Sequence, residues 1–126
     1  MPIDYEIEDG LLRTRCVGDV TWDEVMAHFD ELVADPLRPP ELDVLLDMSA
    51  MESLPSTDQI KGVASRMQEI EAVRFRACAI VAANDALFGM VRMLEVFAER
   101  VFSQTMVFRE LPQAERWLEE VRNVGE

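Results

Sequence analysis

Apolar and polar residues alternate at the start of the chain. Ile3, Tyr5 and Ile7 are separated by charged residues, and after a turn at Gly10 the extended pattern resumes over residues 11–17. Such alternation is typical of strands that bury one face. It predicts that the chain opens with a β-hairpin.

Two later segments begin with a capping box and continue with apolar residues at helical spacing. Thr21 and Glu24 form the first box, whose helix ends before Pro36, and Ser56 and Gln59 form the second. In a capping box each side chain bonds the backbone amide of the other residue, which satisfies free amides at a helix N-terminus. Both patterns predict amphipathic helices.

The remaining elements also follow from the apolar pattern. Residues 42–48 and 75–83 have apolar residues at both odd and even positions, which is typical of strands covered on both faces. Residues 86–100 have helical periodicity, residues 105–108 read as a short strand, and Pro112 begins a last helix. The predicted order is β-β-α-β-α-β-α-β-α. We therefore expect a mixed α/β fold with a mostly parallel sheet, in which the first strand is the antiparallel exception.

The predicted helix at residues 86–100 has two apolar faces. Its broad inner face, which a sheet would cover, contains Leu87, Met90, Val91, Met93, Leu94, Phe97 and Val101. Phe88, Arg92 and Val96, spaced by four residues, form a second line on the opposite face. This second line is a candidate surface for protein contact, a two-fold contact included, in which Arg92 meets an acidic residue of the partner.

The alternative is that this second line is covered from within the chain. The C-terminal helix or residues 102–105 would then cover Phe88 and Val96. Arg92 would pair internally with Glu95 or Glu99, at a net energy near zero.

Methionine is frequent at the inner positions of the predicted elements. The residues concerned, with one phenylalanine, are Met48, Met51, Met67, Met90, Met93 and Phe97. Because methionine adapts to irregular apolar shapes, these residues could line a pocket for a small apolar or lipid-like ligand between the second and third helices. The alternative is ordinary filling of the core.

The chain is strongly acidic. It has 12 Lys and Arg residues against 25 Asp and Glu residues, which gives a net charge of −13. Such a surface repels the phosphates of nucleic acids and anionic lipids, so we expect no nucleic-acid partner. The start has no signal-peptide pattern and no apolar run is long enough to span a bilayer, so we expect a cytoplasmic protein.

The sequence offers little for catalysis. His28, the only histidine, is expected on the first helix, away from the strand ends, which excludes a Ser-His-Asp triad and predicts a partly exposed imidazole without function. Cys16 and Cys78 lie in separate strand-like segments and are expected to be inert core thiols. The five glycines are scattered and form no phosphate-binding loop. We therefore expect no metal, no cofactor and no enzymatic activity.

Four polar residues lie at the carboxyl ends of the two buried strands, namely Asp47, Ser49, Asn84 and Asp85. In open α/β sheets, ligands and partners bind beyond the carboxyl ends of the strands. Asp47 and Asp85 could form an acid and base pair there. The alternative is structural: Asp47 is a turn residue, and Asn84 or Asp85 caps the next helix.

The segment LLDMSAMESLPST, residues 45–57, resembles the part of STAS domains that contains the phosphorylated serine of bacterial anti-sigma-factor antagonists. In this alignment Asp47 and Ser49 match the family's D-x-S, and Ser56 matches the phosphoacceptor. The resemblance implies that Ser56 could be a phosphorylation switch, whereas the capping box alone explains it as a helix cap.

The second half of the chain is similar to bacterial stand-alone STAS-like proteins. The similarity lies in FRACAIVAANDALFGMVRMLEVF, which contains Gly89-Met90-Val91-Arg92-Met93, and in the closing MVFRELPQAERWL. These proteins are related to the sporulation anti-anti-sigma factor, SpoIIAA, and are grouped with lipid-binding CRAL/TRIO domains. The resemblance implies a SpoIIAA-like fold and action by docking to other proteins.

The leading hypothesis is therefore a non-enzymatic STAS-like regulatory module, one domain over residues 1–126. It would act by protein–protein contact, with a protein partner or as a homodimer. The alternative is a binding protein for a small apolar or lipid-like ligand.

Overall fold

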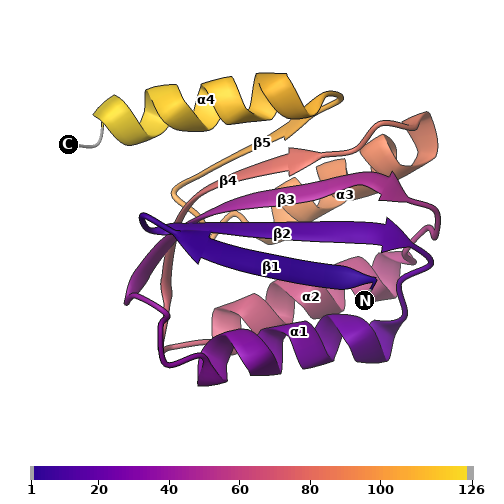
Figure 1. Cartoon of the computed structure of the whole chain (residues 1–126). Coiled ribbons are helices and arrows are strands. Elements are labelled where there is room, and N and C mark those ends of the chain that lie inside the picture. The colour runs from indigo at the N-terminus through magenta and orange to yellow at the C-terminus, as the bar shows by residue number, and fades with distance from the viewer. Residues whose placement is uncertain (1, 125–126) are drawn as a thin grey trace.

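The structure, a computed structural model, describes residues 2–124, which form a five-stranded sheet and four helices (Figure 1). The elements in chain order are β1 (Ile3–Glu8), β2 (Leu11–Gly18), α1 (Trp22–Ala34), β3 (Glu41–Met51), α2 (Thr57–Glu69), β4 (Arg74–Val81), α3 (Asp85–Phe97), β5 (Gln104–Phe108) and α4 (Leu111–Val124). β1 is antiparallel to β2, and the other strand pairs are parallel. The predicted fold class and the predicted order of elements are confirmed.

The opening hairpin turns tightly between β1 and β2. Asp9 and Gly10 occupy its two central positions, with φ of 53° and 76°, and Glu8 pairs with Leu11 across the turn. Two consecutive positive φ angles suit the right-handed twist of a two-residue hairpin, and Asp-Gly is among the residue pairs that adopt them most easily. The predicted turn at Gly10 is therefore present.

The strands lie side by side in chain order, β1-β2-β3-β4-β5. Each parallel connection moves one strand along in the same direction, and right-handed connections then place all three helices on one face. Figure 1 shows α1 and α2 below the sheet, α3 behind β3 and β4, and α4 alone above the sheet; α1, α2 and α3 share one core. Because the strand order never reverses, the sheet of the described residues has no topological switch point to open a crevice at the strand ends.

Both predicted capping boxes are present. Thr21 Oγ1 accepts the Glu24 amide at 3.2 Å, and Glu24 Oε1 accepts the Thr21 amide at 2.9 Å. Ser56 Oγ accepts the Gln59 amide at 3.1 Å, and Gln59 Oε1 accepts the Ser56 amide at 2.9 Å. These bonds begin α1 and α2 at the predicted residues.

Two separate apolar cores cover the two faces of the sheet. The larger core lies between the sheet and α1, α2 and α3, and we call this side the cavity face because its core contains an apolar cavity. The smaller core lies under α4, and we call this side the α4 face; its buried residues are Leu11, Leu45, Ala77, Ala79, Val81, Ala114 and Leu118. Neighbouring residues of β4 supply both, since Cys78 points to the first core and Ala79 to the second.

Candidate functional site

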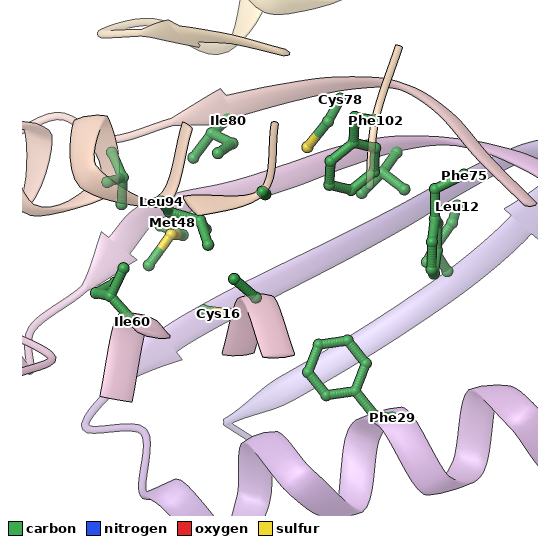
Figure 2. Packing of buried hydrophobic residues seen from close by; sticks show 14 of the residues in the cluster. Leu12, Cys16, Phe29, Met48, Ile60, Phe75, Cys78, Ile80, Leu94 and Phe102 are labelled. Atoms are coloured by element: carbon green, nitrogen blue, oxygen red, sulfur yellow. The ribbon is translucent and has the colours of Figure 1, made fainter. Parts of the chain in front are cut away.

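An apolar cavity of about 120 Å³ lies within the core of the cavity face. Figure 2 shows side chains from the strands and from α1, α2 and α3 that point toward one another around it, Phe29 and Ile60 among them. Its lining is almost entirely apolar. An engineered apolar cavity of about 150 Å³ in another protein stays dry and binds benzene, so a cavity of this size can admit a small hydrocarbon group.

The structure places only half of the predicted pocket residues at this cavity. Met48, Met51 and Met67 line it. Met90, Met93 and Phe97 are partly buried on α3 but are not part of its lining. The cavity lies between the sheet and three helices rather than between α2 and α3 alone, because α3 turns Val91 and Leu94 toward the sheet.

His28 lies at the edge of the same cavity. Its Nε2 atom is 3.4 Å from the hydroxyl of Thr14, and its ring meets the ring of Tyr5 edge to face at 5.4 Å between centroids. Burial lowers the pKa of His28 to about 4, so the imidazole is neutral at pH 7. The ring is partly exposed, as predicted, but the sequence did not place it beside a cavity.

Cys16 and Cys78 are free, buried thiols that line the cavity. Burial, with a smaller effect of the Asp47 charge, raises the pKa of Cys16 to about 12. Burial also raises the pKa of Cys78. Both sulfurs therefore stay protonated at neutral pH and are poor nucleophiles, as expected of core thiols.

Asp47 and Ser49 bond each other at an irregularity in β3. Asp47 Oδ1 accepts the backbone amide of Ser49 at 3.0 Å and its hydroxyl at 2.6 Å. At this point the β2–β3 register shifts. Asp47 pairs with Arg15 and Ala50 pairs with Val17, so β3 has one more residue than β2 between the two pairs. The two bonds of the D-x-S motif thus lie within a bulge of β3 and hold its local conformation.

Asn84 and Asp85 begin α3 and have different partners. Asn84 Oδ1 accepts the Leu87 amide at 2.7 Å, which makes Asn84 the N-cap. Asp85 pairs with Arg109 beyond the end of β5. Asp47 therefore bonds Ser49, and Asp85 pairs with Arg109. Neither contact is the predicted acid and base pair.

The line formed by Phe88, Arg92 and Val96 is partly covered and partly open. The guanidinium of Arg109 lies over the Phe88 ring at 4.2 Å from its centroid. Arg92 Nε is 3.2 Å from Glu95 Oε1, which is one of the internal pairs that the second alternative predicted. Val96 is 63% exposed, and α4 cannot cover it because α4 lies on the other face of the sheet (Figure 1).

Asp43 is a buried polar residue whose role the sequence analysis missed. Only 7% of it is exposed; its Oδ1 accepts the Ala77 amide at 3.0 Å, and its Oδ2 is 3.3 Å from Arg122 Nε on α4. Arg122 also donates to the carbonyl of Asp9 in the first turn. An aspartate inside the apolar run LDVLLDM was the available indication of this polar contact.

Within residues 2–124, no three His, Cys, Asp or Glu side chains are grouped so as to hold a metal ion. Over the same residues, no helix combines the length and the apolar character needed to cross a membrane.

A sequential, mostly parallel sheet with three helices on one face and one on the other defines a small α/β domain of the STAS type. A family model described as SpoIIAA-like matches residues 11–119, and the chain belongs to this SpoIIAA-like family. The resemblance found in the sequence is thereby confirmed. The relation to CRAL/TRIO domains stays a prediction.

Two solved structures share the fold. One is an anti-sigma factor antagonist from Mycobacterium paratuberculosis, with a TM-score of 0.59, 20% identity and coverage of 93% of this chain and 92% of that chain. The other is an uncharacterized protein with a SpoIIAA-like fold from Shewanella loihica PV-4, with a TM-score of 0.58, 18% identity and coverage of 92% and 91%. No curated protein matches the chain.

Proposed function

We propose that the domain is a non-enzymatic regulatory module that acts by contact with another protein, a second copy of the chain included. Membership of the SpoIIAA-like family and the shared fold of an anti-sigma factor antagonist support a regulatory role. The observation that carries the proposal is the exposure of Val96 on α3, at 63%. We call Phe88, Arg92 and Val96 the contact surface.

The energetics of the contact surface suit docking. Burying a valine side chain fully contributes about 1.5–3 kcal/mol, and Val96 has most of that gain still available. Arg92 and Glu95 form an exposed pair on one helix, and such pairs contribute only about 0.3–0.5 kcal/mol. Arg92 can therefore exchange Glu95 for an acidic residue of a partner at little cost.

The test is Val96→Asp, with Leu37→Asp as the matched control. Leu37 is 85% exposed in the connection after α1, so both changes place a carboxylate at an exposed apolar position. We expect sedimentation velocity to show self-association for the wild type and for Leu37→Asp but not for Val96→Asp, with equal thermal stability. A wild type that stays monomeric would exclude the second copy as the partner. Equal co-purification of a partner by both variants would exclude the contact surface.

A second candidate function is the binding of a small apolar ligand in the cavity. Its support is the apolar cavity of about 120 Å³ itself, since most protein interiors have few voids larger than a water molecule. Benzene should raise the melting temperature of the wild type. It should raise that of Cys78→Leu less, because the larger leucine side chain takes up part of the cavity. An equal effect on both proteins would show that the cavity is not the site.

A further inference from the structure

An open hollow of about 720 Å³ lies outside one end of the cavity. Its walls come from the end of α2, the start of β4 and the connection between α3 and β5. Ile70, Val73 and Val101 make part of its surface apolar. The hollow therefore offers both apolar and polar contacts at one place.

Three side chains separate this hollow from the cavity. Met67, Phe75 and Phe102 line both, and the rings of Phe75 and Phe102 lie 5.4 Å apart between centroids. Figure 2 shows Phe102 near Cys78 and Phe75 near Leu12, and Cys78 and Leu12 both line the cavity. Because methionine is unbranched and changes rotamer easily, the wall at Met67 can open without movement of the backbone.

The charge of the hollow is opposite to that of the whole chain. Its lining contains Arg74, Arg76 and Arg100 and, among the described residues that form it, no Asp or Glu. Arg74 and Arg76 share Glu41 at 3.8 and 3.9 Å, which is too long for hydrogen bonds. Among the ion pairs of the described residues, none involves Arg100. Guanidinium groups suit carboxylates, which they bind through paired hydrogen bonds.

The cavity and the hollow are thus complementary in chemistry. The cavity has almost no polar surface and cannot satisfy a charged or hydrogen-bonding group. The hollow has three cations, and it adjoins the cavity through a wall of three apolar side chains. A hollow at the opposite end of the cavity, lined by Trp22, Leu54 and neighbouring residues, has no charged side chain in its lining. Only the arginine end therefore suits an anionic group.

We infer that the ligand is an anionic amphiphile, a medium-chain alkyl carboxylate. Its carboxylate lies among Arg74, Arg76 and Arg100, and the end of its alkyl chain passes Met67 into the cavity. This inference rests on the ligand-binding function proposed above as the second candidate. It adds a head-group site that the cavity alone does not define.

The experiment compares octanoate with octan-1-ol by isothermal titration calorimetry on the full chain. The variants are Arg74→Gln and Arg100→Gln in the hollow, Cys78→Leu in the cavity, and Arg116→Gln on α4 as the matched control. We expect each hollow variant to weaken octanoate about tenfold, as the loss of a charge-assisted bond does. Octanol binding should not change in these variants. Cys78→Leu should abolish the binding of both probes, and Arg116→Gln should change neither.

The other outcomes contradict different parts of the inference. If neither probe binds the wild type, both the ligand function and the head-group site are wrong. If both probes bind, Cys78→Leu blocks them and the hollow variants have no effect, the ligand function survives and the head-group site is overturned. If octanoate binding needs the arginines but ignores Cys78→Leu, the hollow binds anions alone and the alkyl path into the cavity is wrong.

Discussion

The two faces of the sheet bury apolar residues in different ways. On the α4 face, Ala77, Ala79 and Ala114 are small enough to let the helix approach the strands closely, and the Asp43–Arg122 pair fixes its position. On the cavity face, larger side chains from three helices meet the sheet and leave an unfilled volume of about 120 Å³. A close-packed face has one good arrangement, whereas a face with spare volume can adapt. The almost entirely apolar cavity therefore lies on the cavity face, whereas the hollow beside α4 is open and lined largely by charged side chains.

Asp43→Ala is the strongest way to break the α4 face. The change leaves the Ala77 amide without its acceptor and Arg122 without its carboxylate. Removing one partner of a buried pair costs about 3–5 kcal/mol, and the partial exposure of Arg122 places the expected loss near the lower end, about 3 kcal/mol. Urea unfolding measures it. The control Glu115→Ala, which breaks an exposed 3.7 Å pair with Arg13, should cost below about 0.5 kcal/mol. Equal losses would refute the role given to Asp43.

Ala79→Val and Cys78→Val sharpen the comparison within one strand. Ala79 is fully buried against α4, so added methyl groups overpack that face and should cost about 2 kcal/mol. Cys78 borders the cavity, so the added volume has room and stability should change by less than about 0.5 kcal/mol. Chemical denaturation of the two variants measures the difference. Similar losses in both would mean that the cavity face is as tightly packed as the α4 face.

His28→Phe tests the cavity face through pH. The pKa of His28 is about 4 in the folded chain against an ordinary value of 6.5, so the unfolded chain binds more protons between these values. Stability should therefore fall as pH decreases from about 6.5 toward 4, by about 1–2 kcal/mol after allowance for partial exposure. In the variant this component should be missing from unfolding curves recorded at pH 7 and pH 4.5. Parallel pH profiles would show that His28 is not held in its neutral form.

Ser56→Ala has the smallest expected effect and concerns α2, one of the three helices around the cavity. It removes the hydroxyl that accepts the Gln59 amide, and loss of an N-cap costs about 1 kcal/mol. The neighbouring Thr57→Ala should cost much less, as Thr57 already lies within α2. Thermal melts compare the two. Incorporation of phosphate into the wild type by a cognate kinase, absent in Ser56→Ala but present in Thr57→Ala, would establish the second role predicted for this serine.

Local features of the fold could be predicted from the sequence, and contacts between distant residues could not. The hairpin turn at Gly10 and the caps at Thr21 and Ser56 depend on neighbours within a few residues, and the structure contains all three. Helical spacing also identified the inner side of α3 as a whole. It could not tell that Val91 would reach the cavity and Met93 would not, because that depends on how α3 is rotated against the sheet.

The candidate sites show the same limit. Arg109 covers Phe88, and Arg122 pairs with Asp43. Both contacts join residues far apart in the sequence, and helical or strand periodicity does not predict such contacts. The cavity is a property of how three helices fit one sheet, and no residue type marks an empty volume in advance. The six predicted side chains indicated β3, α2 and α3 among the elements around the cavity but not α1, and only three of the six line it.

Arg122 connects the last helix to the first turn, since it donates to the carbonyl of Asp9, 113 residues earlier. During synthesis on the ribosome the strands emerge in the order in which they lie in the sheet, so the hairpin and each later strand can join a neighbour already present. The face that α4 will cover stays bare throughout, with Leu11, Leu45 and Val81 exposed to water. The nascent chain thus depends on its final helix to close that face, and a ribosome that stops before residue 111 releases a sheet with one apolar side open to aggregation.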